Sequence, residues 1–101
     1  SSQEILAVIR SHRPQLQKCR VSAAKKDPRV KGDLKVSWDI NLDGRVQSIK
    51  ITKNTLKNKF LVRCVISKIK KWIFPKPRGG GLVSVKYPFQ FSSGDGADKK
   101  K

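Results

Sequence analysis

The sequence has few of the residues on which metal sites and enzyme active sites depend. It contains one histidine, two cysteines and seven acidic residues in 101, without a Cys-x-x-Cys motif. Two cysteines and one histidine fall short of the four ligands of a structural zinc site. We find no acidic pair placed for acid–base catalysis and no glycine loop that opens a helix to hold phosphate. We therefore expect no metal, no cofactor, no small-molecule substrate and no enzymatic activity.

Long apolar runs are also absent. A membrane-spanning helix needs roughly 20 consecutive apolar residues, so we expect contact with a membrane only through an anchor outside this sequence. The length of 101 residues is typical of one domain with one core. We expect residues 1–92 to form that domain. Glycines, aspartates and three final lysines fill residues 93–101, which predicts a disordered basic tail.

Apolar residues spaced three or four apart predict a first helix over residues 3–20. Pro14 lies inside this stretch and should either kink the helix or divide it near Arg13. His12 falls on the apolar face. Because no second histidine or set of metal ligands accompanies it, we expect His12 to be a packed residue.

The cleanest strand pattern follows a polar loop. Apolar and polar residues alternate over 34–42, which predicts a strand with one buried face. The Asp-Gly pair at 43–44 then predicts a type I′ hairpin turn. The return strand should cover 45–53. Its apolar residues change phase along the strand, which predicts a bulge near Gln47 or Ser48.

A second helix is predicted over residues 60–73, where apolar residues again recur at helical spacing. Asn54 or Thr55 should cap it with a side-chain oxygen. Pro75 and Pro77 should end it, because proline lacks a backbone N–H and favours an extended residue before it.

A third strand is predicted over residues 83–91 by strict alternation, after a triple glycine that lets the chain turn. The order helix, strand, strand, helix, strand leaves the third strand antiparallel only to the first. The sheet order should therefore be 2-1-3. The predicted fold class is α+β, in which two helices of an αββαβ chain cover one face of a three-stranded antiparallel sheet.

The third strand is then an edge, with one row of backbone groups unpaired. Pro88 fits an edge because its missing N–H can face outward. Ser84, Lys86 and Gln90 share its parity and would direct their backbone groups outward, where an extended peptide can pair with them. Two alternatives stay open. The edge could be protected by Pro88, Lys86 and the tail, or it could pair with a second copy in a dimer.

Basic residues greatly outnumber acidic ones, 24 to seven, which gives a formal net charge of +17. This charge favours acidic partners, and Lys76, Arg78 and Lys86 would steer such a partner to the edge strand. It is also compatible with a basic domain that binds an anionic polymer, either nucleic acid or cell-envelope polysaccharide, or with a merely solvated surface. The sequence has no helix-turn-helix, RNA-recognition signature or exposed aromatic platform, which disfavours nucleic acid.

The two cysteines, Cys19 and Cys64, lie on the apolar faces of the two predicted helices and are plausible neighbours. A bridge between them would close a loop of about 45 residues and stabilise the fold by roughly 4 kcal/mol in the chain-entropy model. It would also indicate an oxidising compartment. The alternative is a pair of buried, reduced cysteines that serve as small apolar residues.

Together these segments resemble the C-terminal domain of TonB-like proteins, and most closely the AgmX/PglI C-terminal family of gliding-motility proteins. The resemblance runs from about Ile5 to Phe91. The residues that carry it are Cys19, Gly32, Ile40, Asp43-Gly44-Arg45-Val46, Thr55-Leu56, Cys64, Ile69, Trp72-Ile73-Phe74-Pro75-Lys76-Pro77, Gly79-Gly80-Gly81, Val85 and Tyr87-Pro88-Phe89-Gln90-Phe91. It implies a periplasmic domain tethered to the inner membrane by an upstream segment. Such a domain would bind an envelope or outer-membrane protein and transmit force to it.

Overall fold

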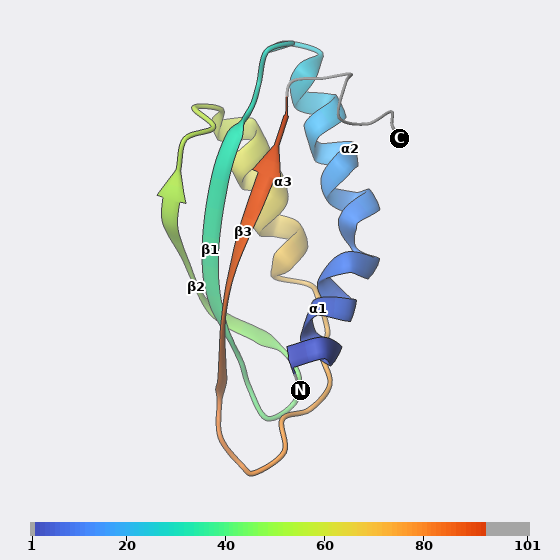
Figure 1. Ribbon diagram of the computed structural model, residues 1–101, viewed down its shortest axis with the longest axis vertical. Helices are drawn as coiled ribbons and strands as arrows, with labels where there is room; N and C mark the ends of the chain where they lie inside the picture. Colours follow the sequence, from blue (N-terminus) through green and yellow to red (C-terminus); the bar gives the residue numbers. More distant parts are fainter. Residues whose placement is uncertain (1, 93–101) are drawn as a thin grey trace.

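The computed structural model describes residues 2–92, and the predicted tail at 93–101 lies outside them. The elements follow in the order α1 (Ser2–Ser11), α2 (Arg13–Ala24), β1 (Gly32–Ile40), β2 (Val46–Asn54), α3 (Lys59–Ile69) and β3 (Val83–Phe91). The strands form an antiparallel sheet of order β2-β1-β3. The helices lie together on one side of this sheet (Figure 1). The predicted α+β class and strand order are confirmed. None of the described helices is long and apolar enough to cross a membrane.

The predicted first helix is divided into two. α1 ends at Ser11, and α2 begins at Arg13 with a proline in its first turn. Pro14 has no N–H to continue the helix, so a break before it costs no hydrogen bond at that position. His12 lies at the break and stacks on Trp72, with ring centroids 4.8 Å apart. His12 is therefore a packing residue, as expected.

The hairpin between β1 and β2 differs from the predicted type I′ turn. Only Gly44 has positive φ there, at 83°, whereas a type I′ turn needs two such residues. Asn41 pairs with Arg45 through a 2.9 Å backbone hydrogen bond, so the loop has three residues. The Asn41 side-chain oxygen also accepts hydrogen bonds from the N–H groups of Asp43 and Arg45. These extra acceptor contacts stabilise the longer loop. β1 ends at Ile40, and Leu42 lies exposed in the loop instead of in the strand.

β2 carries the predicted bulge. Ser37 pairs with Lys50 but Asp39 pairs with Gln47, so β2 contains one extra residue between these pairs. Ser48 has a φ of 56° within this segment. A second irregularity lies between Lys35 and Val36, which pair with Lys53 and Ile51. Bulges of this kind bend a strand and increase its local twist.

α3 begins and ends at other residues than predicted. Asn58 is its N-cap and accepts a 2.8 Å hydrogen bond from the N–H of Leu61, so neither Asn54 nor Thr55 caps the helix. The helix ends at Ile69, well before Pro75, so the prolines do not terminate it. The expected bounds of 60–73 are therefore wrong. The periodic pattern extends further because Trp72, just past the helix, is also buried.

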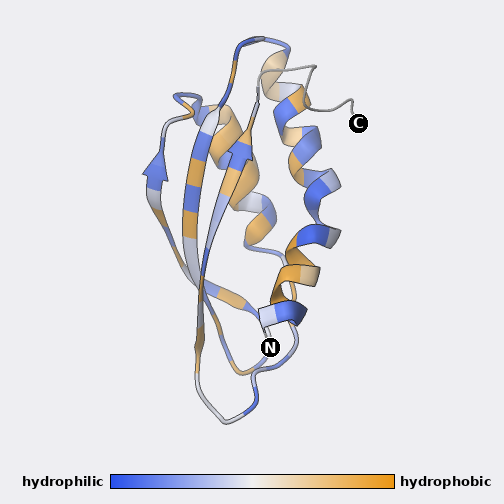
Figure 2. Cartoon of the chain, viewed as in Figure 1, coloured by the Kyte–Doolittle hydropathy of each residue, from blue (hydrophilic) through white to orange (hydrophobic). Residues whose placement is uncertain are grey.

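The core lies between the helices and the sheet. Apolar and polar residues alternate visibly along β1 (Figure 2). Trp38 from β1 lies at the centre of an aromatic cluster and contacts the rings of Trp72, Phe74 and Phe89. The buried apolar residues are Ile9, Leu16, Cys19, Ala23, Val30, Leu34, Val36, Trp38, Ile40, Leu56, Leu61, Val65, Ile69, Trp72, Phe74, Val85, Phe89 and Phe91.

Candidate binding edge and groove

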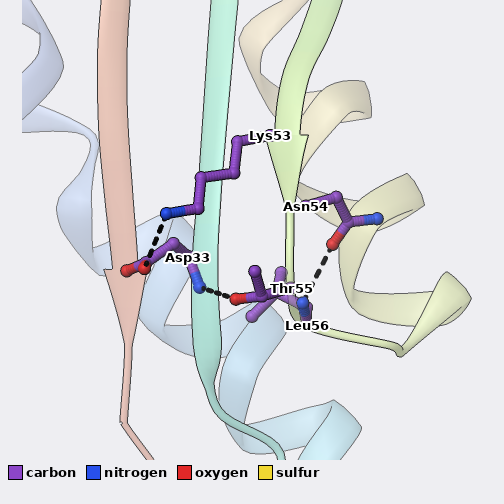
Figure 3. Close-up of polar contacts among 5 residues, drawn as sticks. All are labelled: Asp33, Lys53, Asn54, Thr55 and Leu56. Carbon is purple, nitrogen blue, oxygen red and sulfur yellow. Dashed lines mark hydrogen bonds and ion pairs between the residues drawn. The ribbon is translucent and has the colours of Figure 1, made fainter.

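The backbone groups of Asp33, near the start of β1, form hydrogen bonds on the side of β2. Beside β2, the Thr55 hydroxyl accepts a 2.8 Å hydrogen bond from the N–H of Asp33, and the N–H of Thr55 donates to the carbonyl of Asp33 at 2.9 Å. Asp33 also forms an ion pair with Lys53 at 3.9 Å (Figure 3). Both backbone groups of Asp33 are therefore used on the β2 side. Gly32 permits this arrangement, because a Cβ there would lie 2.7 Å from the Thr55 hydroxyl oxygen.

These bonds set the phase of the β1–β3 pairing. Asp33 is opposite Gln90, and Lys35 is opposite Pro88. Asp33 and Gln90 cannot exchange backbone hydrogen bonds, because the N–H and C=O of Asp33 are bonded on the β2 side. Lys35 and Pro88 cannot exchange a pair of them either, because Pro88 has no N–H. Hydrogen-bonded and non-hydrogen-bonded pairs alternate in an antiparallel ladder. Both observations therefore indicate that the backbone N–H and C=O groups of the even-numbered residues of β3 point away from β1.

Ser84, Lys86 and Gln90 consequently present their N–H and C=O groups along the outer edge of β3. All three side chains are exposed. The Ser84 hydroxyl donates a 2.8 Å hydrogen bond to the Asp39 carboxylate on β1. Within the described residues, no other strand pairs with β3 on this side. β3 is therefore an edge strand of the sheet in the part of the chain that the structure describes.

A groove runs beside this edge. Its walls are α2 and the second half of β3, which rise alongside each other in Figure 1. Its volume is about 770 Å³. The helix contributes Arg13, Gln17 and Arg20, and the strand contributes residues 87–91. The groove therefore borders the second half of the β3 edge.

A disulfide fixes the helix wall of the groove. Cys19 of α2 and Cys64 of α3 are bonded at 2.05 Å, with their Cα atoms 5.8 Å apart. Cys19 is buried in the core together with its α2 neighbours Leu16 and Ala23. The bridge ties α2 to α3, which in turn packs its buried face into the same core. The disulfide therefore links α2, which forms one wall of the groove, covalently to α3.

Lys76 and Arg78 lie apart from this groove. They line a second depression together with the start of α1 and Val83, the first residue of β3. Both side chains are exposed. The structure thus places them beside the beginning of the edge strand, while the groove follows its second half. Arg13, Gln17 and Arg20 line the groove but are not among the binding residues predicted from the sequence. Their four-and-three spacing, which places them on one face of a helix, is the signal that could have indicated them.

Comparisons with known proteins give structural relatives. No protein-family model and no curated protein matches the chain. The solution structure of the Pseudomonas aeruginosa TonB C-terminal domain matches with a TM-score of 0.53 and 25% identity, over 68% of this chain and 71% of that one. That of the Helicobacter pylori TonB C-terminal domain (residues 179–285) matches with a TM-score of 0.53 and 24% identity, over 94% and 85%. The chain therefore has a fold similar to that of TonB C-terminal domains.

Proposed function

We propose that this domain is a non-enzymatic binding module of an energy-transducing envelope system. It binds an extended segment of an envelope or outer-membrane protein by pairing it with the β3 edge, and it transmits force through that contact. The observation that carries the proposal is the open β3 edge, with the backbone groups of Ser84, Lys86 and Gln90 facing outward beside a groove. The similarity to TonB C-terminal domains supports it.

We further propose a periplasmic location. The Cys19–Cys64 bridge supports this, because disulfides persist in oxidising compartments. An upstream segment outside this sequence would tether the domain to the inner membrane. The resemblance to the AgmX/PglI family suggests gliding motility as the process that the domain serves, with envelope transport as the alternative within the same class.

The test is a backbone substitution at the edge. Lys86→Pro removes an outward N–H, and Lys86→Ala removes the same charge but keeps the N–H. We expect the proline variant to bind a verified partner segment about tenfold more weakly than the alanine variant, since one hydrogen bond contributes about 1 kcal/mol and the ring also crowds the added strand. Equal affinities of the two variants would contradict strand addition. Urea unfolding of both variants controls for stability.

The second candidate is binding to an anionic polymer. The face of the sheet away from the helices carries lysines from all three strands, with Lys50 and Lys86 on either side of Ser37. Lys35 and Lys53 are paired in the next row. A polymer held by charge alone should be released from wild type at moderate salt, whether it is DNA or heparin. Salt-resistant binding of one protein segment favours the leading proposal instead.

A further inference from the structure

We infer that one end of the domain docks on the surface of an anionic lipid membrane. The contact is made by an apolar tip, which consists of the exposed side chains of Leu42, Ile73 and Leu82, and by the basic residues around it. The apolar side chains enter the boundary between headgroups and acyl chains, and the basic ones bind the headgroup phosphates. This inference goes beyond the proposed strand addition and does not rest on it.

Backbone pairing brings the three residues of the apolar tip to the same end of the sheet. Leu42 lies in the hairpin loop that follows β1. Ile73 lies opposite Arg45, the residue that closes this loop, in an isolated antiparallel bridge. Leu82 directly precedes β3, whose first residue pairs with the last residue of β1. Figure 1 shows the hairpin and the segment between α3 and β3 at the same end of the molecule.

The side chains of the apolar tip point away from the core. Leu42, Ile73 and Leu82 are 53%, 51% and 56% exposed. Ile73 precedes the buried Phe74, and successive side chains of extended backbone point in opposite directions. A Cβ at any of the glycines 79–81 would meet nothing within 4 Å, so the loop that leads to Leu82 lies in open space. The tip therefore leaves apolar area in contact with water, and removing that area from water is favourable.

Basic residues surround the apolar tip. Residues 41–45 of the hairpin and the segment 70–82 between α3 and β3 contain one acidic residue, Asp43. Their basic residues, all exposed, are Arg45, Lys70, Lys71, Lys76 and Arg78. None of these five forms an ion pair with another residue in the described part of the chain. Their charge is available to lipid phosphates, and each basic residue near an anionic surface strengthens binding about fivefold.

The shape of this end favours a lipid surface over other anionic partners. No residue of the apolar tip lines the groove beside β3 or the depression lined by Lys76 and Arg78. A protein partner would need pockets that fit the protruding side chains, because specific interfaces depend on close packing. A fluid lipid surface accepts such side chains without a matching shape. An anionic polymer offers the charge but no apolar layer, so it would leave the tip in water.

Binding to lipid vesicles tests the inference. The anionic vesicles contain phosphatidylglycerol and phosphatidylcholine in equal parts, and the neutral ones contain phosphatidylcholine alone. Leu42→Ser/Leu82→Ser removes two residues of the tip. Phe60→Ser is the matched control, because Phe60 is 54% exposed near the start of α3, at the other end of that helix from the tip. Vesicle sedimentation gives the affinities, and urea unfolding shows that each variant is folded.

A second pair of variants tests the charge. Lys76→Gln/Arg78→Gln neutralises two basic residues that lie between Ile73 and Leu82 in the chain. Lys18→Gln/Lys25→Gln removes the same charge from α2 and its C-cap, where both side chains are exposed. The first variant should bind the anionic vesicles about tenfold more weakly than the second, because only its lost charges lie at the lipid surface.

We expect wild type to bind the anionic vesicles at least about tenfold more tightly than the neutral ones. Leu42→Ser/Leu82→Ser should weaken binding to the anionic vesicles about tenfold, the effect of two leucine side chains that are each partly withdrawn from water. Phe60→Ser should stay within about twofold of wild type. Heparin, which is anionic but has no apolar layer, should bind the leucine variant as tightly as it binds wild type.

Several results would overturn the inference. If the leucine variant binds the anionic vesicles as tightly as wild type does, the domain is held by charge alone. If Phe60→Ser weakens binding as much as the leucine variant, or if the two charge variants bind equally, another surface makes the contact. A parallel loss of heparin binding in the leucine variant, or an absence of binding to either kind of vesicle, overturns it as well.

Discussion

Gly44 offers the sharpest test of how the hairpin is joined to the core. Its φ is 83°, and a Cβ at this position would lie 2.2 Å from the carbonyl oxygen of Phe74. Its own carbonyl accepts a 2.8 Å hydrogen bond from the N–H of Phe74. Phe74 is buried and packs on Trp38. Gly44→Ala must therefore displace either the hairpin or a core aromatic residue.

The cost of Gly44→Ala can be worked out from three contributions. Left-handed backbone costs an L-residue about 1 kcal/mol. Loss of the hydrogen bond to Phe74 adds about 1 kcal/mol. Displacement of the buried Phe74 ring adds at least about 1 kcal/mol more, since core shifts of this kind cost roughly 1–3 kcal/mol. We expect the free energy of unfolding to fall by about 3 kcal/mol or more.

Two other glycines serve as matched controls. Gly79 has a φ of 87°, but a Cβ there meets nothing within 4 Å. Gly79→Ala should thus cost only the backbone strain, about 1 kcal/mol. Gly81 has neither positive φ nor a close neighbour, so Gly81→Ala should change stability by less than about 0.5 kcal/mol. The three variants are compared by urea unfolding. If Gly44→Ala costs no more than Gly79→Ala, the close contact with Phe74 is refuted.

Three further predictions concern stability and the free edge. Reduction of Cys19–Cys64, or replacement of both cysteines by alanine, should lower the free energy of unfolding by about 2–4 kcal/mol, and a reductant should have no effect on the double variant; unchanged stability would contradict the bridge. Asn58→Ala should cost about 1 kcal/mol in urea unfolding because α3 loses its cap, whereas Asn58→Ser should cost a few tenths at most; equal losses would argue against the cap. In hydrogen exchange, the outward N–H of Lys86 should exchange much faster than that of Val85; the reverse order would refute the strand phase.

The sequence predicted the elements whose pattern has a single physical cause. Alternation over 83–91 gave the bounds of β3, because each odd-numbered residue from 83 to 91 is at least partly buried. A change of phase after Val46 indicated the bulge in β2, since an extra residue is the simplest way to keep one face buried. The strand order followed from chain direction alone. Pro88 predicts the outward parity of the β3 edge, because a proline in a strand is tolerated where its missing N–H faces outward.

Predictions failed where several residues could fill one role. Asn54, Thr55 and Asn58 are all suitable caps, but Asn54 accepts from the N–H of Leu56 and Thr55 from that of Asp33 (Figure 3). Only Asn58 is left at the start of the helix. Trp72 continues the helical period, yet it stacks on His12 and meets Trp38 edge-on. These partners come from other elements, so local periodicity could not locate the end of α3.

The sequence by itself determined the fold class, the strand order and the edge position of β3, because periodicity and chain direction are local properties. Only the tertiary structure decided which helix lies beside that edge. The disulfide between Cys19 and Cys64 and the shared core fix α2 against α3, and this packing brings Arg13, Gln17 and Arg20 to the groove. A row of basic and polar residues on one helix reads in sequence as a solvated face. It becomes a candidate site because the packing of α2 on α3 places it opposite the outer edge of β3.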